Sequence, residues 1–281
     1  MIAVTGATGN IGRPLVSLLA EAGEQVTAVS RNTPGFELPE GVTHQRADLG
    51  DAESLRPSLE GAEALLVLLG GRLNAFGESP ETLLDVVKSS GVKRVVLVSS
   101  QIVGTRPDAI SHGRLRRFEE TVQQSGLEWG ILRPGGFASN AFAWAESVRT
   151  RRTIAAPFAD VALPVIDPAD IAAAADVVLR DGRHSGGIYE LTGPEAITPR
   201  RQAEEIGRAL GESVDFVELT REQAREGMLQ FMPEPVVEGT LDILGTPRPR
   251  EQQVSPAVEQ LVGRPARPFG EWVARNVAAF E

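Results

Sequence analysis

The sequence predicts an α/β fold, in which a doubly wound parallel sheet is followed by a smaller, mostly helical C-terminal lobe. Up to about residue 192, short apolar runs typical of buried strands alternate with amphipathic stretches typical of helices. A glycine-rich segment directly follows the first run. After about residue 193 the pattern changes to helical segments joined by proline-rich stretches. The expected strands are Ile2–Thr5, Gln25–Ser30, Val42–Ala47, Ala64–Leu69, Arg94–Ser99, Glu128–Leu132 and Ile188–Leu191.

The expected helices follow from periodicity and from their end signals. Several of those in the sheet region end at glycine, the residue favoured just beyond a helix C-terminus. In the sheet region they are Ile11–Ala22, Glu81–Ser90, Leu115–Ser125 and Ala169–Arg180; in the lobe they are Pro199–Leu210, Arg221–Met232, Pro235–Leu244 and Phe269–Phe280.

We divide the chain into a sheet domain of residues 1–192 and a helical lobe of residues 193–281, to which residues 135–158 contribute. Ligands of open α/β sheets bind beyond the carboxyl ends of the strands. The lobe is therefore expected to cover that edge and to shape a substrate pocket.

Composition excludes several classes of function. The net charge of −10 argues against nucleic acid as a partner, because a phosphate backbone requires a basic surface. No apolar run reaches the roughly 18 residues of a membrane span, and the chain opens directly into its first apolar run, so we expect neither membrane attachment nor a signal peptide. The absence of cysteine removes thiol chemistry and fits a cytoplasmic protein. Three dispersed histidines predict no metal site. A homo-oligomer stays open.

The glycine-rich segment reads Thr5-Gly6-Ala7-Thr8-Gly9-Asn10-Ile11-Gly12. It lies between the first expected strand and the first helix, as in the Rossmann-type fold. The first glycine allows a tight turn, the second a close approach to a pyrophosphate, and the third close packing of helix on strand. The phosphates would then meet the helix N-terminus, whose free N–H groups favour an anion. The sequence therefore predicts a dinucleotide site that includes Gly6, Thr8, Gly9, Asn10, Ile11 and Gly12.

The end of the second strand indicates which dinucleotide binds. Sites selective for NAD place a carboxylate there, on the ribose 2′-hydroxyl. This chain instead has Arg31, whose guanidinium suits a 2′-phosphate, and Arg13 could assist it. NADP(H) is therefore favoured, with NAD(H) as the alternative. A solvated loop arginine is the alternative reading of Arg31.

Several further segments accompany the glycine motif. With them, the chain resembles the atypical short-chain dehydrogenases, and within these the NmrA-like, NAD(P)-binding branch, which includes quinone and dye reductases and redox-sensing regulators. The segments that carry the resemblance are Ala47-Asp48-Leu49, Ser125-Gly126-Leu127, Leu132-Arg133-Pro134-Gly135-Gly136-Phe137 and Asp167-Pro168-Ala169-Asp170-Ile171.

The resemblance implies positions around the cofactor. Asp48 and Leu49 would border the adenine, and Leu68, Leu69 and Gly70 the adenosine ribose, although the leucines also fit a buried strand. Ser99 and Ser100 would face the nicotinamide region. The loop behind the nicotinamide ring would be Pro134, Gly135, Gly136 and Phe137, with Asn140 facing the pocket. Asp170 is best explained as a structural residue.

The residues of ordinary short-chain dehydrogenase chemistry are missing. Those enzymes use a Tyr-x-x-x-Lys pair beyond the fifth strand, where the tyrosine transfers a proton. The only tyrosine here is Tyr189, in the last expected strand, and the only lysines, Lys88 and Lys93, precede the fifth strand. His112 is the candidate proton donor in the corresponding region. Arg114 or Arg116 would replace the lysine. A solvated histidine at a helix start is the alternative.

An acceptor that stabilises its own negative charge does not need the missing tyrosine. We therefore expect reduction of a quinone or of a polycyclic aromatic, such as an aromatic polyketide, and this could prime the product for oxygenation. The expected substrate residues are Asn140, Phe142 and Phe231. The expected aromatic and methionine wall, which ordinary lobe core would also explain, is Phe137, Phe142, Trp144, Phe158, Met228, Phe231 and Met232. A non-catalytic redox sensor of the NmrA type is the other candidate function.

Overall fold

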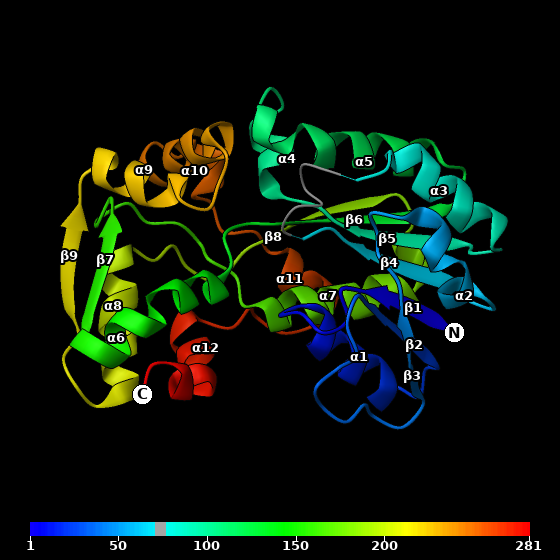
Figure 1. Ribbon diagram of the computed structural model, residues 1–281, viewed down its shortest axis with the longest axis horizontal. Coiled ribbons are helices and arrows are strands. Elements are labelled where there is room, and N and C mark those ends of the chain that lie inside the picture. The colour runs from blue at the N-terminus through cyan, green and yellow to red at the C-terminus, as the bar shows by residue number, and fades with distance from the viewer. Residues whose placement is uncertain (71–76) are drawn as a thin grey trace.

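The computed structural model describes residues 1–70 and 77–281 (Figure 1). Its larger part is a seven-stranded sheet in the order β3-β2-β1-β4-β5-β6-β8, in which every neighbouring pair is parallel. This confirms the predicted fold class. The strands are β1 (Ile2–Thr5), β2 (Val26–Ser30), β3 (Val42–Arg46), β4 (Ala64–Leu68), β5 (Arg94–Val98), β6 (Glu128–Pro134) and β8 (Gly187–Leu191).

Helices cover both faces of this sheet, which explains why its central strands are almost continuously apolar. Successive residues of a strand point to opposite faces. On β1, Val4 joins the core beneath one helical layer and Ala3 the core beneath the other. One layer is α1 (Gly12–Glu21), α7 (Pro168–Arg180) and α11 (Ala257–Val262); the other includes α2 (Arg56–Leu59), α3 (Pro80–Ser89) and α5 (Gly113–Gln124).

The C-terminal lobe lies beyond the carboxyl edge of the sheet, on the left of Figure 1. Besides helices it contains a two-stranded parallel sheet that the sequence pattern does not predict, formed by β7 (Thr153–Pro157) and β9 (Asp215–Leu219). Trp272 and Phe280 are buried in the lobe core, where Phe142 packs against both rings. The lobe helices are α6 (Ala145–Arg151), α8 (Pro199–Leu210), α9 (Arg221–Leu229), α10 (Glu234–Gly245) and α12 (Phe269–Asn276).

Short helices link these layers near the carboxyl edge. After β5 the chain forms α4 (Gln101–Thr105) and then a 3₁₀ helix, Ile110–His112, that leads into α5. After β6 it forms a 3₁₀ helix, Ala138–Trp144, that leads into the lobe. Other 3₁₀ helices are Ala52–Leu55, Gly182–His184, Pro249–Glu251 and Val277–Ala279.

After α10 the chain returns to the sheet domain before it ends in the lobe. Buried carboxylates hold this returning segment. Asp170, on α7, accepts hydrogen bonds from the side chains of Arg264 and Arg267, and Asp167, which also caps α7, pairs with Arg275. The structure therefore gives Asp170 the structural position expected for it.

In the part of the chain that the structure describes, none of the helices has the length and apolar character that crossing a membrane requires.

Candidate active site

The glycine-rich loop connects β1 to α1 in a geometry that only glycine accommodates. Gly6 has φ +65°, and a Cβ atom there would lie 2.8 Å from Leu68 Cδ2. At Gly12 a Cβ atom would lie 2.2 Å from the Gly6 carbonyl oxygen. The Gly9 N–H donates to that same oxygen at 2.9 Å, which closes the turn. The predicted turn therefore requires glycine at positions 6 and 12, because a side chain at either position would clash with neighbouring atoms.

The start of α1 is open to an anion. Thr8, Gly9 and Asn10 are exposed, and the buried Ile11 precedes the helix without a side-chain cap. The first turn carries no acidic residue. Its N–H groups and the helix dipole can therefore act on a negatively charged ligand such as a pyrophosphate.

Two arginines flank the adenosine end of this loop. Arg31 is exposed directly after β2, in a turn where the Ser30 hydroxyl donates to the Asn32 carbonyl oxygen at 2.7 Å. The Arg13 guanidinium lies 4.3 Å from the centre of the Phe36 ring. Both residues follow strands of the sheet at its carboxyl edge, and their binding to a 2′-phosphate stays a prediction.

The residues expected around the adenosine follow β4 and β3, which lie on either side of β1 and β2 in the sheet. Leu68 packs on Gly6, Leu69 is buried, and Gly70 is exposed. Beyond β3, the Asp48 carboxylate accepts the Gly50 N–H at 2.8 Å and shapes its own turn, and Leu49 is half-buried. Leu68 therefore packs on the glycine-rich loop, whereas Leu69 belongs to the sheet core. A position of either residue beside the adenosine ribose stays a prediction.

At the end of β5 the structure reveals a buried polar network. Ser99 is buried, and its hydroxyl donates to Glu119 Oε1 at 2.5 Å. Glu119, also buried, accepts two hydrogen bonds from the guanidinium of Arg133, at 2.9 and 2.5 Å. The Glu119 carboxylate therefore fixes the orientation of the Ser99 hydroxyl. Ser100 caps α4 by accepting the Ile102 N–H at 3.2 Å.

Sequence reasoning missed the role of Glu119, although a signal was present. Leu115, Phe118, Glu119 and Val122 share the buried face of α5. A carboxylate on the core face of an amphipathic helix requires a buried partner, because an unpaired charge there is costly. The pattern indicates the need for a partner; only the tertiary structure identifies Arg133.

The loop after β6 is held on both sides. The Gly135 N–H donates to the Leu191 carbonyl oxygen at 2.9 Å, and the Gly136 carbonyl oxygen accepts the Ile166 N–H at 2.8 Å. Pro134 is buried and Phe137 half-buried. These hydrogen bonds hold the loop in place at the carboxyl edge of the sheet, where the family resemblance implies that the nicotinamide binds.

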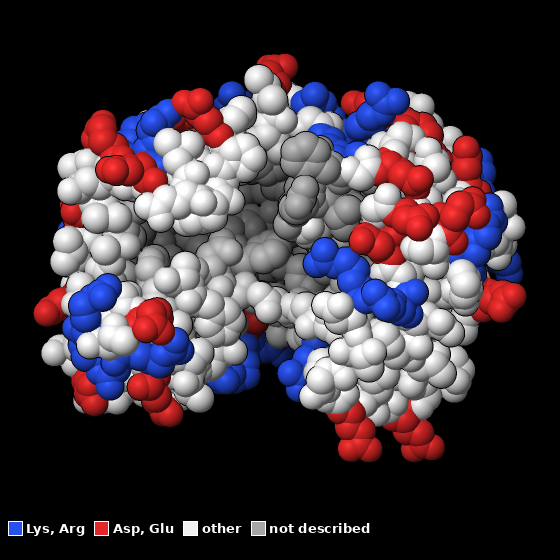
Figure 2. All heavy atoms as spheres, viewed as in Figure 1, with Lys and Arg blue, Asp and Glu red and all other residues white. Residues whose placement is uncertain are grey.

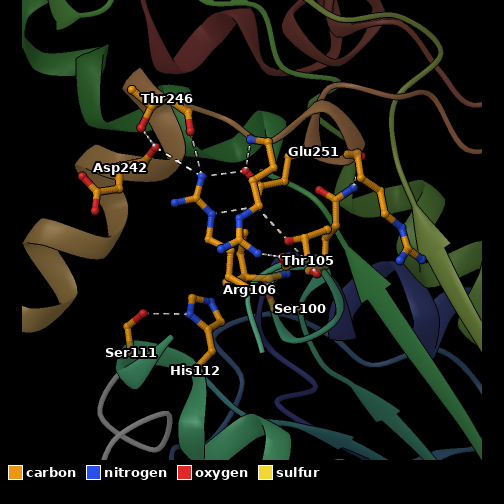
Figure 3. Close-up of polar contacts among 12 residues, drawn as sticks. Ser100, Thr105, Arg106, Ser111, His112, Asp242, Thr246 and Glu251 are labelled. Carbon is orange, nitrogen blue, oxygen red and sulfur yellow. Dashed lines mark hydrogen bonds and ion pairs between the residues drawn. The ribbon is translucent and has the colours of Figure 1, made fainter. Parts of the chain in front are cut away.

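His112 lies at the start of α5, next to Ser111, whose hydroxyl is 3.0 Å from His112 Nδ1 (Figure 3). Burial lowers the pKa of His112 below its usual value of 6.5, so the imidazole is neutral at pH 7. Arg116 has the position of the missing lysine relative to His112, but its guanidinium is bonded to the Pro107 carbonyl oxygen. Arg114 donates to the Glu78 carbonyl oxygen at 2.6 Å.

The expected aromatic wall is divided between core and surface. Phe158, Met228 and Met232 pack together in a small hydrophobic cluster beneath α9 and α10. Phe231 is 75% exposed, and Asn140 is exposed at the start of the lobe. The remaining members of the wall are Phe137, which packs against the sheet core, and Phe142 and Trp144, which pack in the lobe core.

Figure 2 shows that the molecule is hollowed between the lobe and the sheet domain. Two cavities lie between these parts, and of the expected wall only Phe142 lines one of them. One cavity, of about 310 Å³, lies between the glycine-rich loop and α12 and is bordered by Phe142. The other, of about 430 Å³, separates α4 and the 3₁₀ helix Ile110–His112 from α10. The second has the size of a small-molecule site and includes Ser111, the neighbour of His112.

Comparison with known proteins identifies this arrangement. A family model described as NAD(P)H-binding matches residues 6–181. The chain belongs to this family.

Several relatives of this NAD(P)H-binding protein are reductases. It is 34% identical to (4-alkanoyl-5-oxo-2,5-dihydrofuran-3-yl)methyl phosphate reductase of Streptomyces griseus, over 100% of this chain and 99% of the relative. It is 31% identical to the NAD(P)H azoreductase of Xenophilus azovorans, over 100% and 99%. The NADPH-dependent quinone oxidoreductase of Escherichia coli, solved with NADPH, has a TM-score of 0.79 and 25% identity, over 98% of this chain and 99% of that chain.

These matches confirm the resemblance to NAD(P)-binding reductases. The solved structure of NmrA, a negative transcriptional regulator in complex with NADP, is 19% identical with a TM-score of 0.75, over 99% of this chain and 95% of that chain, and shares the fold. The matches to reductases also establish the general activity. The protein is an NAD(P)H-dependent oxidoreductase.

Proposed function

We propose that the protein reduces a quinone, or a related polycyclic aromatic acceptor, with NADPH. One observation carries the proposal: the chain has no tyrosine or lysine that can act at the carboxyl edge near His112. Tyr189 lies in β8, where its hydroxyl is 2.9 Å from His184 Nδ1. Lys88 and Lys93 precede β5. An acceptor whose reduced form is stabilised without an enzymic phenol therefore fits best.

The residues of the chain have the following roles in this proposal. The glycine-rich loop and the N-terminus of α1 hold the pyrophosphate, and Arg31 selects the 2′-phosphate. The loop Pro134–Phe137 backs the nicotinamide, which supplies a hydride when the cofactor is bound. Ser99, fixed by Glu119, borders this region. On the lobe side, Phe142 is proposed to meet the acceptor, because it lines a cavity. Asn140 and Phe231, also expected there, are exposed and line neither cavity.

The overall reaction balances without another reductant. A quinone takes one hydride and one proton to give a hydroquinone, and NADPH becomes NADP⁺. Because charge in the hydroquinone anion is delocalised over the ring, orientation of the two rings can supply most of the rate. The proton is proposed to come from His112 or from solvent.

The first experiment incubates the protein with NADPH, or with NADH, and either a panel of quinones or a panel of simple ketones, and follows the nicotinamide absorbance. We expect one equivalent of hydroquinone per NADPH consumed, faster turnover with NADPH than with NADH, and no ketone reduction, because an isolated alkoxide requires a proton donor. Protein-free mixtures are the control. Reduction of ketones without reduction of quinones would contradict the proposal.

A further inference from the structure

The cavity of about 430 Å³ has two walls that belong to different parts of the chain. We call it the interlobe groove. Ile102, on α4, and Ile110, on the 3₁₀ helix, form apolar parts of one wall, and Pro235 and Ile243, on α10, face them from the lobe. Ile110 is 85% exposed, so its apolar side chain is accessible to a ligand in the groove.

The groove reaches the direct neighbour of the candidate proton donor. Ser111 lines it, and the Ser111 hydroxyl is 3.0 Å from His112 Nδ1. Figure 3 shows Ser111 and His112 side by side, with Arg106 and Glu251 nearby. A molecule whose reacting ring lies near His112 can therefore extend past Ser111 into the groove.

We propose that the interlobe groove binds an uncharged hydrocarbon extension of the acceptor, such as an alkyl tail or a further fused ring, and that Gly239 determines how large that extension can be. The inference rests on the proposed quinone reduction and assigns a second subsite to the same ligand. Burial of apolar surface between α4 and α10 supplies the affinity.

Charge on the groove walls favours an uncharged extension over an anionic one. Asp108, Glu238 and Asp242 contribute three carboxylates, against the guanidinium groups of Arg106 and Arg248. Arg106 is held by the buried Glu251 carboxylate at 2.7 Å. Two of the carboxylates are also paired, since Arg221 binds Glu238 and Asp242, and Arg225 binds Glu238. A phosphate or carboxylate on the tail would therefore lose its hydration and find few unpaired cations to replace it, so it should weaken binding.

Gly239, on α10, lies against Ser111 of the opposite wall. A Cβ atom built on Gly239 would lie 3.0 Å from Ser111 Oγ and 3.6 Å from Ser111 Cβ. A larger side chain at position 239 must therefore displace Ser111 or project into the groove. Gly227, on α9, offers a matched control, because a Cβ atom there meets nothing within 4 Å.

The experiment compares 2-decyl-1,4-benzoquinone with unsubstituted 1,4-benzoquinone, using kcat/KM at saturating NADPH. In the wild type we expect the decyl compound to be preferred. Gly239→Val should reduce the ratio of the two kcat/KM values about tenfold, because burial of even two methylene groups contributes more than this. Gly227→Val should leave the ratio unchanged. Ile243→Ser removes an apolar side chain from the groove without adding bulk next to Ser111. It should also lower the ratio of the two kcat/KM values.

Two further arms separate the possible failures. Calorimetric binding of the non-reducible 2-decyl-1,4-dimethoxybenzene to the NADP⁺-loaded protein should weaken about tenfold in Gly239→Val, which tests the groove without turnover. A quinone with a terminal carboxylate on the same tail should lose the preference shown by the decyl compound. Equal ratios in wild type and Gly239→Val, or preference for the carboxylate tail, would overturn the inference. Groove binding without reduction of either quinone would instead contradict the proposed function alone.

Discussion

At the scale of single residues, the proposed function assigns cofactor choice to one side chain and proton supply to another. Arg31 is exposed after β2, and His112 is half-buried at the start of α5. In the proposal Arg31 binds a cofactor phosphate, so cofactor affinity tests it. His112 acts through its protonation state, so the pH dependence of the rate tests it.

Arg31→Ala should raise the dissociation constant of NADPH about tenfold or more while leaving that of NADH nearly unchanged. The reason is that hydrogen bonds to charged groups contribute about 1.5–3 kcal/mol, and only NADPH carries the 2′-phosphate. Fluorescence titration of each cofactor measures both constants. Arg151→Ala, which removes an exposed arginine of the lobe, is the control. An equal loss of affinity for both cofactors would remove the assignment.

His112→Gln should alter the pH dependence of quinone reduction. Burial lowers the pKa of His112 below 6.5, so the imidazolium, the form that donates a proton, accumulates only as the pH falls through that lowered value. The wild-type kcat/KM should therefore rise with acidification. The variant should lack this rise, and its kcat/KM should be about tenfold lower than that of the wild type at acidic pH. This effect is smaller than general acids usually produce, because the hydroquinone anion is already stabilised by delocalisation.

The control for His112 is His184→Gln, since His184 contacts Tyr189 in β8 and should leave the profile unchanged. Identical pH profiles for the wild type and His112→Gln would show that solvent supplies the proton.

At the scale of elements, a buried carboxylate fastens the segment after α10 to α4. The Glu251 carboxylate is 1% exposed and accepts hydrogen bonds from Arg106 at 2.7 and 2.8 Å and from the Thr105 hydroxyl at 2.8 Å. Burial by itself raises the pKa of Glu251, but the hydrogen bonds from Arg106, the Arg248 N–H and Thr105 outweigh it, so the pKa lies below 4.5.

Glu251→Gln should lower the free energy of unfolding at pH 7 by about 3 kcal/mol, because removing one partner leaves a buried guanidinium uncompensated. A carboxylate with a depressed folded-state pKa stabilises the protein above its unfolded value, and that stabilisation is lost as the pH falls through the folded value. The difference between wild type and variant should therefore shrink below about pH 4.5. Urea unfolding followed by tryptophan fluorescence measures it.

Glu259→Gln, which changes an exposed carboxylate in the same segment, should leave the stability at pH 7 nearly unchanged. A difference between Glu251→Gln and wild type that stays constant down to pH 4 would contradict the explanation from the Glu251 charge.

At the scale of the whole molecule, the sheet and most helices could be predicted because each is written in local patterns of apolar residues. The strands β7 and β9 could not. Thr153–Pro157 includes two alanines and ends in proline, Asp215–Leu219 is mostly exposed, and the two pair across about 60 intervening residues. Local propensity carries no information about such a pairing.

The candidate site divides in the same way. The glycine-rich loop is a local motif, and the requirement for glycine at Gly6 and Gly12 can be predicted from the turn that the motif forms. The partners of Glu119 and Glu251 are different, because Arg133 and Arg106 are brought to them by the tertiary fold. Sequence could indicate that these carboxylates need partners, but not which arginines supply them.

The path of the chain has a consequence for motion. It leaves the sheet domain after β6, returns for α7 and β8, builds α8 to α10 in the lobe, returns again for α11, and ends in the lobe with α12. Two bodies joined by one linker bend about a hinge, but several crossings, tied at Asp167 and Asp170, oppose such bending. We therefore expect acceptor exchange to occur by small sliding of α10 over the 3₁₀ helix Ile110–His112, and the two bodies to unfold as one cooperative unit.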